Sequence, residues 1–366
     1  MINRTDAHYE QVARADRQPV RIVLAGCGAV TRLYYAPALA RLQRDGSIKV
    51  IAIFDPDDGA IATVHNTLPA AVAARCFKDL LALGANVAIV ASPPRFHADQ
   101  TIEALRAGLH VLCEKPLATT SQDAAQIVAA ADALGLSAAV ALVRRQFPST
   151  RSIKDILDSG IIGQLRAVTC FEGGPFDWPV ASPRYFDRNE SGGGVLQDIG
   201  THCLDLLSWW LGTPVGIDYA DDAIGGIEAN CLLRLQYNGF EACVRLSRDW
   251  ARPNNYHFEG DHGWLSWTVN DIETVEVGFN KAKMSGRLSP WGSSDEVPDF
   301  IGCFAVQIKS FVNSIQTGAP PPVPARAGRD VLALIDRCYA TRRLIEMPWM
   351  SPEERACAVE FDQSAA

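Results

Sequence analysis

The sequence predicts an α/β protein in which a parallel sheet, covered by helices on both faces, is followed by a second, mostly antiparallel sheet. Three observations support this prediction. Short apolar runs alternate with helical stretches up to about residue 140, and strand-like alternation joined by tight turns dominates beyond about residue 145. The chain has 366 residues, which is too long for one ordinary core and favours two domains.

The apolar runs of the first region predict strands, and the segments between them predict helices. The strands are Val20–Ala25, Lys49–Phe54, Asn86–Ala91, His110–Cys113 and Ser137–Val143. The helices are a stretch from the turn at Gly28 to Leu42, Ile61–Ala74 with Pro69 as a weak point, Ala98–Ala107 and Ser121–Leu134. Because the strands are apolar throughout, helices should cover both faces of their sheet, as in a doubly wound Rossmann architecture.

The second region combines helices with short strands. The predicted helices are Ser149–Ser159, Thr201–Leu211, Phe304–Gln316 and Gly328–Glu346. The predicted strands are Leu165–Phe171, Asn230–Tyr237, Glu241–Ser247, Tyr256–Glu259, Trp264–Val269 and Thr274–Gly278. Turns such as Asn238-Gly239 are hairpin signals, so this sheet should be mostly antiparallel.

The change of pattern places a domain boundary near residue 143. We expect a first domain over 18–143 and a second over 144–350, with tails at 1–17 and 351–366. The closing helix at 328–346 would be able to pack back on the first domain.

Composition and charge exclude several classes of protein. Hydrophobic residues make up 48% of the chain and charged residues 21%, which is typical of a packed globular protein. A formal net charge of -8 argues against a nucleic-acid partner. The N-terminal segment lacks the apolar stretch of a secretory signal, and no run reaches the ~18 apolar residues of a membrane helix. We therefore expect a cytoplasmic protein with no membrane partner.

The ten cysteines are scattered and form no C-x-x-C pair. In a large cytoplasmic chain this distribution predicts reduced, mostly buried thiols. Clustered cysteine or histidine ligands are missing, so we expect no metal site.

A glycine-rich turn follows the first predicted strand. In Gly26-Cys27-Gly28-Ala29-Val30-Thr31, the first glycine allows a tight turn and the second lets the backbone approach a pyrophosphate at the start of the next helix. Thr31 replaces the usual third glycine. Its place between a strand and a helix makes this turn a predicted dinucleotide site, built from Gly26, Gly28, Ala29, Val30 and Thr31.

Asp55 ends the second predicted strand. A carboxylate there can accept hydrogen bonds from both hydroxyls of an adenosine ribose and would repel a 2′-phosphate. The next residues, Pro56-Asp57-Asp58, supply no cation for such a phosphate. This pattern favours NAD, with NADP as the alternative cofactor. The competing interpretation is that Asp55 only caps a loop.

Lys115 lies in the triplet Glu114-Lys115-Pro116, at the carboxyl end of the strand His110–Cys113. Ligands of open parallel sheets bind at this end of the strands. A lysine here can hold or protonate a substrate oxygen beside a nicotinamide. A surface lysine before a turn-forming proline is the alternative interpretation.

Asp198 and His202 follow a run of three glycines at 192–194. The glycines make the backbone flexible or let it approach a ligand closely. The two side chains are four residues apart and would share one face of a helix. A neutral histidine can take the proton that an alcohol loses when a hydride leaves its carbon. Alternatively, Asp198 is a helix cap and His202 a core residue.

Taken together, these motifs resemble the glucose-fructose oxidoreductase/inositol dehydrogenase/rhizopine-catabolism (Gfo/Idh/MocA) family. The resemblance extends from Val20 to about Glu346. The glycine turn, the segment Tyr34–Leu39, the Glu114-Lys115-Pro116 triplet and the segment 192–202 carry it. It implies a Rossmann domain followed by an α/β domain with an open antiparallel sheet, whose outer face commonly builds homodimers or homotetramers.

The resemblance also implies roles for individual residues. Lys115 would contact the reacting oxygen, Asp198 and His202 would complete the substrate site, and His202 would be the preferred proton carrier. Glu114 would line the cofactor site, and the bond from Lys115 to Pro116 is often cis in the family. A loop at 92–97 would place Ser92, Pro93 and His97 beside the nicotinamide half of the cofactor.

Two positions depart from the family pattern, and one loop is a candidate for substrate contact. Tyr34 stands where many relatives carry histidine, and the segment around Arg145 matches the family's Arg-Phe-x-Pro pattern only loosely. The aromatic loop at 172–191 contains Trp178 and Tyr185, which with Arg145 are candidate substrate contacts. A role of this loop in subunit contact is the alternative.

We therefore expect an NAD(P)-dependent oxidoreductase that transfers a hydride between the nicotinamide and a secondary alcohol or ketone carbon of a sugar, sugar derivative or cyclitol. Two alternatives stay open. One is an enzyme that retains its cofactor, as in aldose-aldose oxidoreduction or NAD-dependent glycoside cleavage. The other is a non-catalytic ligand sensor or corepressor, which the presence of both Lys115 and His202 disfavours.

Overall fold

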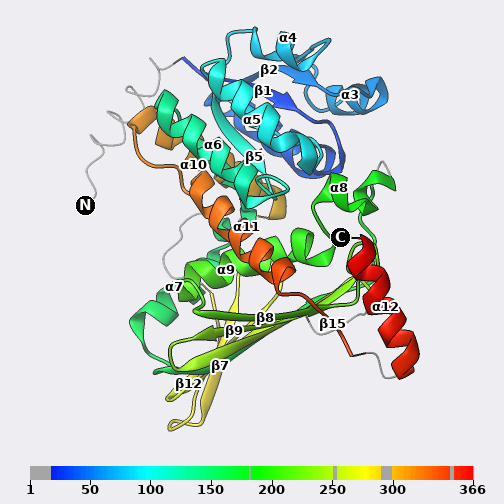
Figure 1. Ribbon diagram of the computed structural model, residues 1–366. Helices are drawn as coiled ribbons and strands as arrows, with labels where there is room; N and C mark the ends of the chain where they lie inside the picture. The colour runs from blue at the N-terminus through cyan, green and yellow to red at the C-terminus, as the bar shows by residue number, and fades with distance from the viewer. Residues whose placement is uncertain (1–17, 181–182, 250–253, 290–298, 347–349, 366) are drawn as a thin grey trace, which may run out of the picture.

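The computed structural model describes residues 18–180, 183–249, 254–289, 299–346 and 350–365. The expected tail at 1–17 lies outside the described residues. The chain forms a six-stranded sheet and a nine-stranded sheet, which lie at the top and bottom of Figure 1. This is the predicted combination of two sheets.

The smaller sheet has the strand order β3-β2-β1-β4-β5-β6. Its strands are β1 (Val20–Ala25), β2 (Ile48–Phe54), β3 (Val72–Ala73), β4 (Val87–Val90), β5 (His110–Glu114) and β6 (Ala138–Ala141). All neighbouring strands pair in parallel, and β4 and β6 are buried throughout. The order reverses between β1 and β4, which is the point where open α/β sheets bind ligands. The predicted doubly wound parallel sheet is confirmed.

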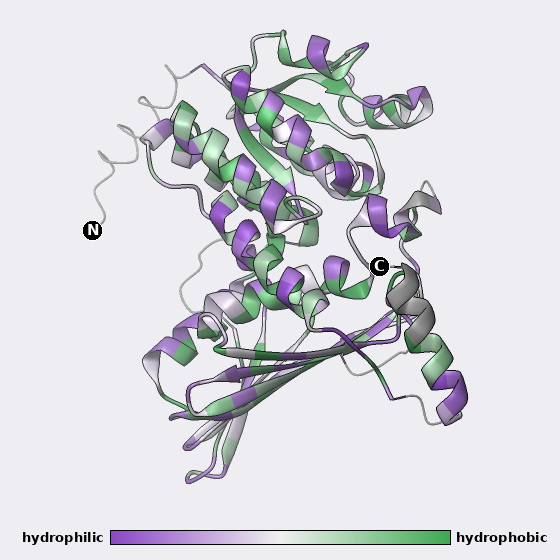
Figure 2. Ribbon diagram, viewed as in Figure 1, coloured by the Kyte–Doolittle hydropathy of each residue, from purple (hydrophilic) through white to green (hydrophobic). Residues whose placement is uncertain are grey.

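Helices cover both faces of this sheet. They are η1 (Thr31–Tyr35) continuing into α2 (Ala36–Arg44), α3 (Asp58–His65), α4 (Phe77–Leu81), η2 (Pro94–Phe96), α5 (His97–Arg106) and α6 (Ser121–Leu134). The strands are coloured as hydrophobic in Figure 2, while the outer sides of the helices are mostly hydrophilic.

The prediction of one helix over Ile61–Ala74 is wrong in its second half. Helix α3 ends at His65, because Pro69 has no N–H to donate and disfavours a helical conformation at the residue before it. The chain then adds the short edge strand β3 beside β2, where Ala74 N donates to Ile53 O at 2.9 Å. Helix α4, which follows, was not predicted.

The larger sheet has the order β14-β13-β12-β11-β7-β10-β9-β8-β15. Its strands are β7 (Leu165–Gly173), β8 (Gly216–Asp221), β9 (Asn230–Tyr237), β10 (Phe240–Ser247), β11 (Asn255–Gly260), β12 (Gly263–Thr268), β13 (Val275–Phe279), β14 (Met284–Leu288) and β15 (Arg343–Leu344). The pairs β7·β10 and β8·β15 are parallel, and the remaining pairs are antiparallel. The sheet is therefore mostly antiparallel, as predicted.

The C-terminal part differs from the prediction. Helix α11 (Ala325–Ala340) ends six residues before the expected Glu346 (346 minus 340), because Arg343 and Leu344 pair with β8 as strand β15. The expected tail at 351–366 is helical over α12 (Pro352–Ala365). Strands β8 and β14 were also missed.

Helices α9 (Thr201–Leu211), which continues from η5 (Leu196–Gly200), and α11 lie between the two sheets (Figure 1). The other helices include η3 (Val143–Gln146), α7 (Pro148–Ser159) and α10 (Phe300–Thr317), which contacts α2 and η1 of the first region. Helix α11 contacts α6 and β6 on one side and α9 and β8 on the other. Trp210 of α9 packs edge-on against the sheet residues Tyr256, Phe258 and Trp267, which anchors α9 on the larger sheet.

Over the residues that the structure covers, no helix has the length and apolar character needed to cross a bilayer. The ten cysteines are free thiols, and eight of them are buried or half-buried. No cluster of potential metal ligands occurs among the described residues.

Candidate active site

The turn after β1 needs its first glycine and leaves space at its second. Gly26 has φ +97°, and a Cβ added there would lie 2.3 Å from the carbonyl oxygen of Ala91. A Cβ added to Gly28 would meet nothing within 4 Å, so this stretch of backbone borders open space. Thr31 Oγ1 donates to Gly26 O at 2.7 Å and closes the turn. A pyrophosphate therefore fits against Gly28 at the start of the helix formed by η1 and α2.

Asp55 holds this turn from the end of β2. Its Oδ2 accepts a hydrogen bond from Cys27 N at 2.7 Å, and its Oδ1 accepts one from Asp57 N at 2.9 Å. Asp55 therefore does cap a loop, as the competing interpretation expects. Each carboxylate oxygen keeps a further lone pair, so hydrogen bonds to a ribose are still available.

The loop after β4 carries the three predicted residues Ser92, Pro93 and His97. His97 is only 1% exposed, and its two ring nitrogens lie 2.7 Å from Pro116 O and from Ser92 O. The ring therefore joins the loop after β4 to the loop after β5. Ser92 Oγ donates to Gln100 Oε1 at 2.7 Å, and Pro93 caps the short helix η2.

Glu114, at the end of β5, is buried and fixed from two sides. It accepts hydrogen bonds from Tyr35 Oη at 2.7 Å and from Lys115 N at 2.9 Å. The peptide bond between Lys115 and Pro116 is cis, as expected from the resemblance.

The structure brings Lys115, Asp198 and Tyr185 together from three segments of the chain. Lys115 Nζ donates to Asp198 Oδ1 at 2.5 Å, and Tyr185 Oη donates to Asp198 Oδ2 at 2.5 Å. Arg248, which the sequence analysis did not single out, forms an ion pair with Asp198 Oδ2 and donates to Tyr185 Oη at 3.3 Å.

His202 lies one helical turn beyond Asp198, at the start of α9. The residue is half-buried, and its Nδ1 atom is buried without a hydrogen-bond partner among the described residues. Burial lowers the pKa of His202 well below its usual value, and the cations of Lys115 and Arg144 act in the same direction. The imidazole is therefore neutral near pH 7.

Lys115 is itself in an unusual environment, with its side chain 19% exposed. Its pKa is lowered to about 8, mainly by burial and also by Arg248 and Arg144, while Glu114 and Glu172 oppose the shift. The Asp198 carboxylate, in direct contact, also favours the ammonium form. A lysine that loses its proton near pH 8 can serve as an acid or a base close to neutrality.

The arginine that faces this group is Arg144, and not the predicted Arg145. Arg144 forms a buried ion pair with Glu172, which also accepts a hydrogen bond from Tyr256 Oη at 2.7 Å. Arg145 instead pairs with Asp205 of α9, one helical turn beyond His202, with 2.6 Å between Nη2 and Oδ1. The expected substrate contact of Arg145 is therefore not supported by its position, since its guanidinium is already paired elsewhere.

The two predicted aromatic residues lie in different surroundings. Trp178 stacks on Tyr34 with 6.4 Å between ring centroids, and Tyr34 in turn stacks on Phe304. Tyr185 reaches Asp198 and packs against Phe176. Tyr185 is thus placed in the group around Lys115, whereas Trp178 belongs to an aromatic cluster against α10.

Glu228 supports the glycine run and has no sequence signal of its own. Its carboxylate accepts hydrogen bonds from Gly194 N at 3.0 Å, Leu196 N at 2.9 Å and Tyr339 Oη at 2.8 Å. A Cβ added to Gly194 would lie 2.0 Å from Glu228 O. The glycines therefore serve close packing within the protein, and the expected approach to a ligand does not explain them.

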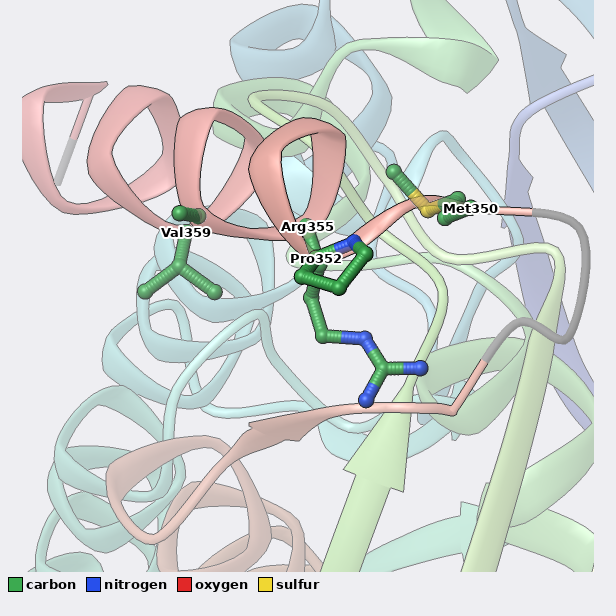
Figure 3. Close-up of a pocket in the computed structure, with 5 residues that line it drawn as sticks. Met350, Pro352, Arg355 and Val359 are labelled. Carbon is green, nitrogen blue, oxygen red and sulfur yellow. The ribbon is translucent and has the colours of Figure 1, made fainter.

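A hollow occurs beside α12, away from this group. Met350, Pro352, Arg355, Ala356 and Val359 line it, and Figure 3 shows four of them on or next to α12. This hollow shares no residue with the group around Lys115. The candidate site therefore rests on the contacts among Lys115, Asp198, Tyr185 and Arg248, and not on this hollow.

Comparison with known families matches both halves of the chain. Residues 20–142 match the GFO/IDH/MocA model described as "Oxidoreductase family, NAD-binding Rossmann fold", and residues 150–266 match the GFO/IDH/MocA C-terminal domain. Rhizopine catabolism protein MocA of Rhizobium meliloti is 30% identical over 240 residues, which are 63% of this chain and 68% of that protein. A dTDP-3,4-didehydro-2,6-dideoxy-alpha-D-glucose 3-reductase of Actinomadura kijaniata is 29% identical over 70% of this chain and 76% of its own length.

Two solved structures share the fold. Levoglucosan dehydrogenase in complex with NADH and levoglucosan superposes with a TM-score of 0.79 at 18% identity, over 88% of this chain and 97% of that chain. A 3-ketoreductase from Actinomadura kijaniata in complex with NADP superposes with a TM-score of 0.77 at 24% identity, over 90% and 100%. At these identities the likeness concerns the fold.

Proposed function

We propose, since this chain belongs to the Gfo/Idh/MocA family of NAD(P)-dependent oxidoreductases, that Lys115, Asp198, Tyr185 and His202 act on a secondary alcohol or ketone carbon of a sugar, sugar derivative or cyclitol. The observation that carries this proposal is the contact of Lys115 with Asp198, which joins the carboxyl end of β5 to the segment that bears His202. A bound nicotinamide supplies the hydride acceptor or donor.

Lys115 is the group that we assign to proton exchange. In the oxidation direction its neutral amine takes the hydroxyl proton of the substrate, and in the reduction direction its ammonium donates a proton to the ketone oxygen. His202 was expected to carry this proton. Burial, together with the neighbouring cations of Lys115 and Arg144, disfavours an imidazolium, so we assign His202 to orienting a substrate hydroxyl as a neutral ring.

A polyhydroxylated substrate suits the polar groups at this position. Asp198 is 28% exposed and offers carboxylate oxygens, while Tyr185 offers a hydroxyl that can donate or accept. The relatives support the same class by name, since they include a scyllo-inositol 2-dehydrogenase of Bacillus subtilis and a D-glucoside 3-dehydrogenase of Escherichia coli.

For the cofactor we propose a preference for NAD over NADP. The carboxylate of Asp55 lies at the end of β2, directly against the glycine turn, where its charge would repel a 2′-phosphate. Glu114 and Ser92 would lie nearer to the nicotinamide half, because β5 and β4 lie on the other side of β1 from β2, the strand that Asp55 follows.

For organisation we propose a dinucleotide-binding domain over 18–143 and a domain over 144–350 for substrate binding and assembly. Helices α9 and α11 lie on one face of the larger sheet, and in Figure 1 no described helix covers its other face. That open face supports a homodimer or homotetramer. Light scattering on the purified protein tests it, and a monomeric mass would contradict it.

The proposed reaction is tested by a panel of sugars, cyclitols and sugar nucleotides with NAD and with NADP, followed at 340 nm. Reduced cofactor that accumulates in proportion to an added polyol supports a freely exchanging dehydrogenase. Turnover without net absorbance change would instead indicate a retained cofactor. Binding of a sugar without any turnover would contradict the proposed reaction.

A further inference from the structure

Arg248 follows β10 and points into the group around Lys115. Its side chain is 19% exposed, and its guanidinium lies 4.9 Å from the centroid of the Phe176 ring. It reaches Oδ2 of Asp198, while Lys115 reaches Oδ1 of the same carboxylate. One carboxylate thus lies between two cations that approach it from different elements.

Two further carboxylates face Lys115, and each has another partner. On β5, Glu114 is held by Tyr35, and Glu172 of β7 is paired with Arg144. From α9, His202 contributes no charge near pH 7.

Asp198 is therefore the carboxylate on which two cations converge. If Arg248 were absent, Lys115 would be the only cation in contact with Asp198 and would hold its proton more tightly.

We propose that Arg248 is a positioning residue of the reaction centre, which holds Asp198 and Tyr185 in place and supplies the counter-charge that lets Lys115 exchange its proton with the substrate oxygen. This inference rests on the proposed function. In the oxidation direction, the substrate O–H bond breaks and an N–H bond forms on Lys115, while the C–H electron pair leaves as hydride to the nicotinamide. Asp198 remains a carboxylate throughout, because Arg248 stays paired with it.

The charges near Lys115 indicate what removal of Arg248 would do. The pKa of Lys115 is lowered to about 8 by burial together with nearby like charges, of which Arg248 is one. Without Arg248, this repulsion is lost, and Asp198 pairs with Lys115 alone. Both changes raise the pKa of Lys115.

The experiment is the pH dependence of kcat/KM in the oxidation direction at saturating NAD, for the full chain and four variants. Oxidation needs the neutral amine, so the wild-type rate should rise with pH and level off above about 8. Arg248→Met and Arg248→Gln should move this midpoint upward by about one pH unit, equivalent to a loss of about tenfold at pH 7. Arg248→Lys keeps a cation and should leave the midpoint near that of the wild type.

Arg145→Met is the matched control, because it removes another ion-paired arginine that is bound to Asp205 instead. It should leave the midpoint unchanged even if it lowers the melting temperature. A midpoint that stays in place in both Arg248→Met and Arg248→Gln overturns the proposal, whatever the loss in rate. If Arg248→Met does not fold, the comparison of Arg248→Gln with Arg248→Lys decides it. Failure of the proposed function is distinguishable from failure of the Arg248 proposal, since in that case the wild type would oxidise no polyol at any pH.

Discussion

The glycine turn after β1 and the group around Lys115 lie at the same edge of one sheet but are built in different ways. The turn is local: Gly26, Gly28 and Thr31 lie within six residues, and Asp55 is its main long-range support. The Lys115 group draws on β5, η3, β7, η5, α9 and the residue after β10. The comparison teaches that the glycine turn, the cofactor end of the site, depends on backbone shape. The group around Lys115, the substrate end, depends on charges that meet only after folding.

The largest effect should come from removing the amine at the substrate end. Lys115→Met should lower kcat by ~10²- to ~10⁴-fold, because proton transfer by a placed side chain contributes about this much. Dinucleotide affinity, measured by fluorescence titration with NADH, should change little if the two ends are independent. An unchanged kcat would show that Lys115 does not exchange the proton.

The two glycines allow a sharper test at the cofactor end. Gly26→Ala places a Cβ at φ +97° against Ala91, so it should lower the melting temperature and the NADH affinity together. Gly28→Ala has open space for its Cβ and should weaken NADH binding by about tenfold or more while the melting temperature is kept. Equal NADH affinity in Gly28→Ala and the wild type would place the pyrophosphate elsewhere.

Glu228 holds the backbone of the segment that leads to Asp198 and His202, through hydrogen bonds from Gly194 N and Leu196 N. Glu228→Gln sets an amide against donors at Gly194, Leu196 and Tyr339, so the free energy of unfolding should fall by about 1–3 kcal/mol. We expect kcat to fall by about tenfold, since Asp198 and His202 follow this segment, while KM for NAD is kept. Tyr339→Phe removes only one of these hydrogen bonds and should have a smaller effect. A fall in stability with kcat unchanged would limit Glu228 to a structural role.

The last prediction concerns the choice of dinucleotide, where a ratio of rates should change while the reaction itself is kept. Asp55→Asn removes the charge and keeps an oxygen acceptor for the turn, so the ratio of kcat/KM for NAD over NADP should fall by about tenfold. Asp57→Asn, in the same loop, is the control and should leave the ratio unchanged. A wild type that already prefers NADP would contradict our proposal for Asp55.

Local patterns predicted much of the fold. The apolar runs that became β1, β2, β4 and β5 are recognisable because each is buried on both faces, and helix α9 has the predicted limits Thr201–Leu211. The helix predicted over Ile61–Ala74 ends at His65 instead, because Pro69 cannot donate the hydrogen bond that would continue it. Strand β15 could not be predicted, because two residues become a strand only when β8 lies beside them.

For the site, the sequence by itself determined where the dinucleotide turn lies and which lysine ends a parallel strand, since glycine conformation and hydrophobic period are properties of neighbouring residues. The tertiary structure decided the rest. It selected Arg144 over Arg145, added Arg248 and Glu228, turned His97 inward and placed two cations on Asp198. Coulomb and desolvation energies depend on separation and burial in space. Lys115 and Asp198 are 83 residues apart in the chain. Their interaction energy therefore arises only when the fold brings the two side chains into contact.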